Sequence, residues 1–250
     1  ELFPNLHAIF LAGKKLLDLS KLGAIKKLNY LFIEIGNKKR KLDGIENIEI
    51  GKLDVTADVK QDILVLSKCK PPKTLWIRKI SELDTEKLSS TNISNLTLIS
   101  GKFQSISNTN ALKKLEELCL SHCRRLISFG EGNSILKRLE IEACSKLDLR
   151  TTANFEGLNH LTLRTQKITA FDFLNELKAL KNLKILNSKV LTDDYGPLIN
   201  SLSLKQVWLS VNKKTIEKIA KQNDNLKITN GDVFYKHGKV VSTDEYFDRI

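Results

Sequence analysis

The sequence predicts a right-handed α/β solenoid of about eleven repeats, with parallel strands on a concave face and mixed short helices and turns on a convex face. Two observations predict this architecture. The stretch 115–126 (LEELCLSHCRRL) recurs 21 residues later at 136–147 (LKRLEIEACSKL). The same aliphatic spacing then continues at intervals of about 22 residues along nearly the whole chain. A regular period of about 20–29 residues is typical of stacked repeats.

Each repeat is predicted to carry one short strand, and we call its first inward-facing residue the anchor. Residues alternate faces along a strand, so the anchor and the residue two positions later should enter the core. The residue two after every anchor is aliphatic, and so are nine of the eleven residues three before it. The predicted anchors are Ile9, Leu31, Leu53, Leu75, Leu96, Leu118, Leu139, Leu161, Leu183, Val207 and Leu226.

The repeats are expected to form one continuous body, because a single strand of this kind cannot bury its apolar side alone. Eleven strands at about 4.8 Å spacing make a ladder roughly 50 Å long. We assign residues 1–231 to the solenoid and residues 232–250 to a C-terminal cap within the same domain. In that cap, residues 233–241 are predicted to form a small hairpin that turns at His237–Gly238. The sequence shows no N-terminal cap.

The segments that return from one strand to the next are predicted to be irregular. Four of them carry helical spacing, at residues 18–28, 81–88, 173–183 and 215–220. Residues 105–109 and 128–132 are short and rich in Ser, Asn and Gly, which favours turns. Residues 36–42 contain the one tight basic cluster, Lys38–Lys41, and are predicted to form an exposed loop.

The pattern LxxLxLxxCxxL, read with Ile as Leu at one position of the second copy, resembles the leucine-rich repeat family, in a short and degenerate form of 21–22 residues. The resemblance covers residues 2–231 and does not single out a subfamily. In that family, an Asn or Cys five residues after the anchor hydrogen-bonds the turn between repeats. Cys123, Cys144 and Asn212 match this column outright. The resemblance therefore implies a structural role for these three residues, and no particular partner.

Composition favours a folded protein with a positive surface. Hydrophobic residues make up 41% of the 250 residues, enough for a substantial core, and the longest apolar runs are far too short to span a membrane. The net charge of +12 comes from 41 Lys and Arg against 29 Asp and Glu. Lys is spread along the chain, as expected of a solvated surface, although such a field also attracts acidic proteins or nucleic acid.

The cysteines and the general composition suggest a compartment. Four Cys in a chain of this length do not form a disulfide framework, so we interpret them as reduced thiols of a cytoplasmic protein. Lys, Ile and Asn are abundant and Met is absent, which is typical of an AT-rich, bacterial coding sequence.

The residue types that carry chemistry are scattered rather than clustered. Cys119, His122, Cys123 and Cys144 include metal-ligand types, but the register places Cys119 on the opposite side of the strand from Cys123 and Cys144. His160 is expected on the concave face beside Arg138 and Arg164, without a nucleophile at a fixed spacing. No phosphate-binding loop or nucleophile motif is present. The sequence therefore predicts no enzyme activity, no cofactor and no metal site.

The exposed side of the strands is the predicted binding surface, because both Trp residues and several other aromatic and cationic residues fall there. Trp, Tyr and Arg dominate the energetics of protein interfaces. An alternative for Phe10 and Phe32 is that they pack on one another or are covered by another segment. The partner-binding residues predicted from the sequence are Phe10, Tyr30, Phe32, Trp76, Arg78, Arg138, His160, Arg164, Lys184 and Trp208.

These observations lead to a first hypothesis, in which the chain is a non-catalytic module that binds an acidic or mixed-charge protein. One concrete form is a bacterial immunity-type protein that neutralises a cognate toxin. A second hypothesis is nucleic-acid binding through the same face or through residues 38–41, although Asp54, Glu117, Glu140 and Glu142 interrupt the basic track. A third is that the chain is the recognition domain of a longer effector protein. We expect no membrane association.

Overall fold

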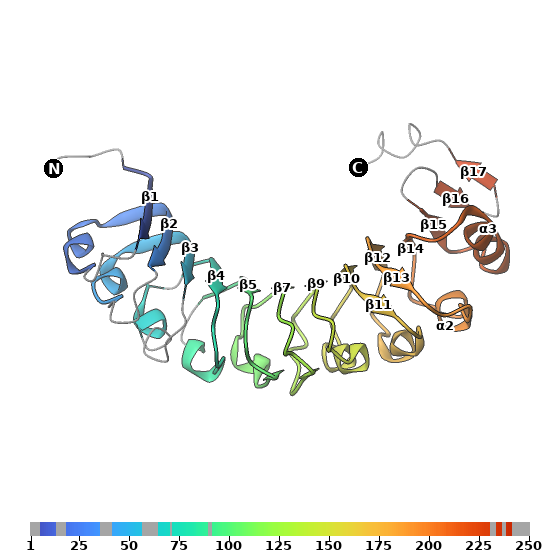
Figure 1. Cartoon of the computed structure of the whole chain (residues 1–250), viewed down its shortest axis with the longest axis horizontal. Helices are drawn as coiled ribbons and strands as arrows, with labels where there is room; N and C mark the ends of the chain where they lie inside the picture. The colour runs from blue at the N-terminus through green and yellow to red at the C-terminus, as the bar shows by residue number, and fades with distance from the viewer. Residues whose placement is uncertain are drawn as a thin grey trace.

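The computed structural model describes residues 6–13, 19–35, 42–56, 65–70, 72–89, 92–230, 234–236 and 239–241. In this part of the chain, eleven parallel strands stack in chain order into one sheet, which confirms the predicted solenoid. The strands line the concave side of an arc and the returning segments form its convex side (Figure 1). The parallel strands are β1 (Ala8–Gly13), β2 (Lys27–Ile35), β3 (Glu49–Thr56), β4 (Thr74–Arg78), β5 (Asn95–Ile99), β7 (Glu117–Ser121), β9 (Arg138–Glu142), β10 (His160–Arg164), β12 (Asn182–Leu186), β14 (Gln206–Leu209) and β15 (Lys227–Thr229).

The register of the sheet follows the predicted anchors through the first ten strands. Ile9 lies opposite Leu31, and the pairing continues anchor to anchor up to Leu183 opposite Val207. From β2 onward these anchors are almost fully buried. The last anchor was predicted wrongly, because Val207 pairs with Ile228 and not with Leu226. Lys227 and Thr229 therefore flank the anchor of β15.

Six successive repeats leave their strands through a residue in the left-handed conformation. Four positions after six successive anchors, a non-glycine residue has a φ of 49–61°, and several of these residues donate their backbone N–H to the strand of the next repeat at 2.8–3.1 Å. This column replaces the sharp turn that glycine usually provides. Its members are Lys79, Ser100, His122, Ala143, Thr165 and Asn187.

The returning segments contain less helix than the sequence predicted. The 3₁₀ helices are η1 (Ser20–Ala24), η2 (Ile45–Asn47), η3 (Glu86–Leu88), η4 (Thr109–Ala111), η5 (Leu149–Asn154) and η6 (Asp172–Glu176). The α-helices that lie wholly within the described residues are α2 (Gly196–Ile199) and α3 (Lys213–Gln222). Most returns cross the convex side in short 3₁₀ segments, because 3₁₀ helices occur in short pieces and helical stability in proteins comes mainly from packing rather than from local propensity. The predicted helix at 173–183 is wrong beyond residue 176, since β12 begins at Asn182.

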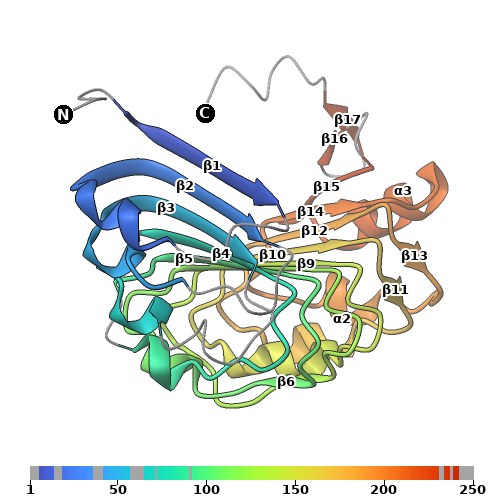
Figure 2. The same cartoon turned by 60° about the vertical axis from the view of Figure 1, so that its left-hand side comes forward.

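Two of the predicted turns also contain short strands. β6 (Ser105–Ile106) pairs with β8 (Ser128–Phe129), and β11 (Lys167–Ile168) pairs with β13 (Lys189–Val190), all in parallel. Figure 2 shows the main strands fanned across one side of the arc and the returns gathered on the other. The core between the two sides is aliphatic near the strands. On the return side it contains several buried Phe, with Phe129 and Phe155 in edge-to-face contact at 4.9 Å.

Beyond β15 the sheet continues with two antiparallel strands. β16 (Phe234–Lys236) pairs with β15, and β17 (Lys239–Val241) pairs with β16. These strands coincide with the arms of the predicted hairpin, and the role of residues 232–250 as a cap stays a prediction. The predicted turn of the hairpin at His237–Gly238 lies outside the described residues, and so does the basic cluster Lys38–Lys41. Leu42, at the end of the predicted basic loop, is buried in the core.

Candidate binding surface

The predicted binding residues all lie on the strands of the concave face. They divide into an N-terminal group on β1 to β4, a central group on β9 and β10, and a C-terminal group on β12 and β14. The parallel register lines up equivalent positions on adjacent strands, so residues about 22 apart in sequence become neighbours. The N-terminal group is Phe10, Tyr30, Phe32, Trp76 and Arg78; the central group is Arg138, His160 and Arg164; the C-terminal group is Lys184 and Trp208.

The N-terminal group forms a continuous cluster of rings and cations, which we call the aromatic cluster and which also contains Lys52. Phe10 meets Tyr30 edge-to-face at 5.2 Å and lies 6.1 Å from Phe32. The Lys52 ammonium lies 3.8 Å from the Trp76 ring centre and 5.2 Å from that of Tyr30. The Phe rings therefore do pack on one another, yet Phe10 remains 67% exposed.

A buried carboxylate holds this cluster in place. Asp54 is 1% exposed, and Arg78 donates from Nε and Nη2 to its two oxygens at 2.8 and 2.7 Å. Tyr30 donates its hydroxyl to the same carboxylate at 3.5 Å. The Arg78 guanidinium also lies 5.8 Å from the Phe32 ring centre. Hydrogen bonding to Asp54 raises the pKa of Arg78, and burial together with Asp54 raises the pKa of Tyr30. Sequence reasoning named Asp54 only as an interruption of the basic track and missed its role.

The central group pairs its arginines with carboxylates. Arg164 donates from Nε to Glu140 at 2.6 Å, and Arg138 lies 3.7 Å from Glu117. These side chains line an open hollow of about 690 Å³, which runs along the concave face from Lys52 and Trp76 to Lys184. Charge in the middle of the hollow is therefore largely compensated.

His160 lies on the floor of this hollow. Burial, and then the charges of Arg138 and Lys184, lower its pKa, so the ring is neutral at neutral pH. Asn182 donates its amide to Nε2 at 3.0 Å and Nδ1 contacts the Asn159 side-chain oxygen. Both ring nitrogens are thus occupied, and the surroundings of His160 are those of a hydrogen-bonded surface residue.

A serine, a histidine and a glutamate meet at the ends of β7 and β9. Ser121 donates to Glu142 at 2.7 Å, and its Oγ lies 2.8 Å from Nδ1 of His122. In a nucleophilic triad the histidine stands between the hydroxyl and the carboxylate. Here the hydroxyl stands between the other two groups and its proton goes to the carboxylate, so the order does not activate Ser121.

The cysteines of β7 and of the adjoining turns differ in burial. Cys123 and Cys144 are fully buried, and their Sγ atoms approach backbone carbonyl oxygens of their own and the preceding repeat at 3.4–3.8 Å. Cys119 is half-buried on the concave face, where burial and the charges of Glu140 and Glu142 raise its pKa to about 12. All four thiols are free. Among the described residues, no three His, Cys, Asp or Glu side chains come together as a metal site. No helix in that part of the chain is long and apolar enough to cross a membrane.

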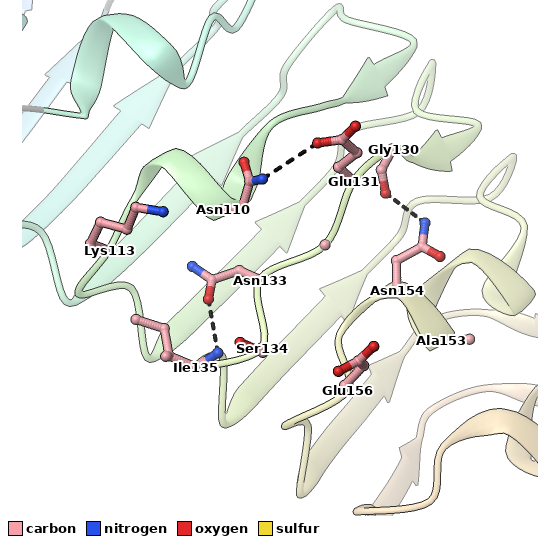
Figure 3. Close-up of a pocket in the computed structure, with 11 residues that line it drawn as sticks. Asn110, Lys113, Gly130, Glu131, Asn133, Ser134, Ile135, Ala153, Asn154 and Glu156 are labelled. Atoms are coloured by element: carbon pink, nitrogen blue, oxygen red, sulfur yellow. Dashed lines mark hydrogen bonds between the residues drawn. The ribbon is translucent and has the colours of Figure 1, made fainter.

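A second hollow, of about 590 Å³, lies between returning segments (Figure 3). Its polar side chains mostly serve the turns. Asn133 donates to the carbonyls of Thr109 and Leu112 at 3.1 and 2.9 Å, and Asn154 donates to the carbonyl of Phe129 at 3.1 Å. We interpret this hollow as the space between stacked turns.

Comparisons with known proteins add little beyond the geometry. No family model matches the chain. No curated protein matches it either. Among solved structures, an internalin (inlF) from Listeria monocytogenes is similar, at 17% identity and a TM-score of 0.44, covering 91% of this chain and 76% of that one. The repeat pattern and the anchor-to-anchor register together show that the chain has the leucine-rich repeat solenoid fold.

Proposed function

We propose that this protein is a non-catalytic recognition module that binds another protein, of acidic or mixed charge, through its concave face. The observation that carries this proposal is the aromatic cluster. Trp, Tyr and Arg are the side chains that most often dominate binding energy at interfaces, and Tyr30, Trp76 and Arg78 lie half-buried on this face. A ring at the edge of the sheet that remains 67% exposed, as Phe10 does, has apolar surface that a partner would remove from water.

The cluster is also rigid before binding, which favours affinity. Arg78 is fixed by two hydrogen bonds to Asp54, and Lys52 is held over two rings. Side chains that are already ordered lose little conformational entropy on binding, a cost of about 0.5–1.5 kcal/mol for each side chain that must be immobilised. A preorganised patch suits specific recognition of one surface.

One form of this function is an immunity-type protein that neutralises a cognate toxin in the bacterial cytoplasm. Neutralisation by covering a toxin requires binding and no chemistry, and the mixed-charge hollow suits a partner with charges of both signs. The bacterial and cytoplasmic assignments are supported by the amino-acid composition and the free thiols. As a third hypothesis, the chain is the recognition part of a longer effector.

Nucleic-acid binding is the second candidate function, favoured by the net charge of +12. It would use a continuous basic track with stacking aromatic residues. Three of the cations on the concave face are instead paired with carboxylates, at Asp54, Glu117 and Glu140. The salt dependence of binding separates the two functions, because phosphate contacts give a steep and linear loss of log affinity with log salt.

The test is affinity capture with the wild-type chain and with Trp76→Ala. The matched control is Thr97→Ala, since Thr97 lies directly opposite Trp76 on the next strand. We expect the purified partner to lose at least tenfold in affinity for Trp76→Ala and less than twofold for Thr97→Ala. Equal binding by both variants would remove the aromatic cluster from the interface, and binding of nucleic acid alone would favour the second function.

A further inference from the structure

The two tryptophans of the chain occupy equivalent strand positions, each beside a lysine, and these two lysines lie at the two ends of the concave hollow. Lys52 lies 3.8 Å from the Trp76 ring centre, and Lys184 lies 5.9 Å from that of Trp208. Both tryptophans occupy the position directly after the anchor. Each pair places a cation on an aromatic face, where the attraction holds the ammonium in position.

The two lysines differ from the cations between them. Arg78, Arg138 and Arg164 each pair with a carboxylate. Within the described residues, Lys52 and Lys184 have no carboxylate within ion-pair distance. Uncompensated positive charge on the hollow is therefore concentrated at its two ends, while the middle is nearly neutral.

The separation of the ends is set by the sheet. Lys52 lies on β3 and Lys184 lies on β12. Five strands lie between them, in the order β4, β5, β7, β9 and β10. Six strand spacings of about 4.8 Å give roughly 29 Å along the sheet. Because the face is concave (Figure 1), the straight line between the lysines is somewhat shorter than this path along the sheet.

The element that spans this distance must satisfy its own backbone. The strands from β3 to β12 already pair with neighbours on both sides, so they offer side chains and no free ladder to an incoming strand. An α-helix satisfies its backbone internally, and about 18 residues, or five turns, cover roughly 27 Å. A straight helix laid across a concave arc also meets the two ends of the arc first.

We propose that the concave face recognises a partner α-helix that carries two acidic groups about 18 residues apart, one held by Lys52 beside Trp76 and the other by Lys184 beside Trp208. This inference rests on the proposed function and specifies the partner. Two anchors on one rigid element bind with an effective concentration set by their spacing, so a helix with the matching spacing gains affinity over either end alone. The charge-paired middle would reject a helix that places acidic groups there.

The test uses synthetic alanine-rich helical peptides without tryptophan. Each carries two blocks of two glutamates and a leucine, and the blocks are centred about 18 or about 11 residues apart, which keeps both on one helical face. Trp76→Phe and Trp208→Phe each leave one tryptophan, so fluorescence reports each end separately. We expect the longer peptide to change both tryptophan signals and to bind at least tenfold more tightly than the shorter one.

Charge variants complete the experiment. Lys52→Gln and Lys184→Gln should each reduce binding of the longer peptide about tenfold and abolish the preference for spacing. Lys113→Gln, on an exposed returning segment, should change neither the affinity for the longer peptide nor the preference for spacing. Equal affinity for the two peptides would overturn the two-anchor inference. So would the absence of any fluorescence change, and so would tighter binding of oligothymidine with the same lysine dependence. The capture experiment with Trp76→Ala is independent of these peptides, so it shows separately whether the proposed function fails.

Discussion

Arg78 and Arg164 offer a controlled comparison of how burial sets the strength of an ion pair. Each arginine stands three residues after its anchor and contacts the carboxylate one residue after the anchor on the preceding strand. The two pairs therefore occupy the same register positions, while their surroundings differ and Arg78 makes two hydrogen bonds where Arg164 makes one. The Asp54 and Arg78 side chains are 2% and 29% exposed, whereas Glu140 and Arg164 are 40% and 39% exposed.

We predict that Arg78→Met destabilises the protein by about 3 kcal/mol, because it leaves the Asp54 carboxylate buried without its cation. The lower end of the usual range for broken buried pairs applies, since the guanidinium is partly open to water. Arg164→Met should cost less than about 1 kcal/mol, as is common for exposed pairs. Adding Asp54→Asn to Arg78→Met should recover part of the loss.

Urea denaturation followed by circular dichroism measures these differences. Repeat arrays can melt from one end, so the fluorescence of Trp76 should be recorded beside the global signal. Loss of the Trp76 signal at lower urea than the signal of Trp208 would indicate local melting around β3 and β4. If Arg78→Met and Arg164→Met cost the same, or if Arg78→Met falls within about 0.5 kcal/mol of wild type, burial of Asp54 is not what gives the pair its strength.

Three other predictions follow from the turns and the thiols. Gly132→Ala should destabilise the protein by more than about 3 kcal/mol in a thermal melt, because a Cβ there would lie 1.5 Å from the Asn154 carbonyl oxygen. Gly130→Ala in the same turn should cost far less, because the nearest atom to its Cβ would lie 3.2 Å away. Thr165→Gly should raise stability by about 0.5–1 kcal/mol by relieving a φ of 53°, and a loss would show that the strain is negligible. At pH 8, Cys119 should react with iodoacetamide at least about a hundredfold more slowly than a free thiol, because its pKa near 12 keeps it protonated; a pH–rate profile with a midpoint near 9 would contradict this.

The sequence predicted where the proposed binding residues lie. It did not predict which side chains they contact. Counting from the anchors put Trp76, Arg78, Arg164 and Trp208 on the concave face, where the structure has them. The sequence did not show that Asp54 would be buried beneath Arg78, because its burial depends on side chains from the adjacent strands, where Phe32 and Trp76 lie directly opposite it. Nor did it distinguish paired from unpaired cations, since that depends on which side chains on adjacent strands reach one another.

The anchors predicted from the sequence are in register in ten of the eleven strands, because a regular apolar spacing lets successive repeats stack in one shared core. The exception, Leu226 in place of Ile228, has a clear cause. Two aliphatic residues two positions apart face the same side of a strand, so the pattern fits both frames equally well. Pairing with Val207 on β14 decided between them.

The tertiary structure also decided the nature of the returns and of the binding surface. Helical spacing at 18–28 and 81–88 became single 3₁₀ turns, because stacking of neighbouring repeats, and not local propensity, fixes how much chain each return can hold. Likewise, the sequence determined which residues leave the core, since that follows from alternation along a strand. Only the stacked strands determined that Lys52 and Lys184 would each lie beside a tryptophan, because those contacts join residues 24 positions apart across neighbouring strands.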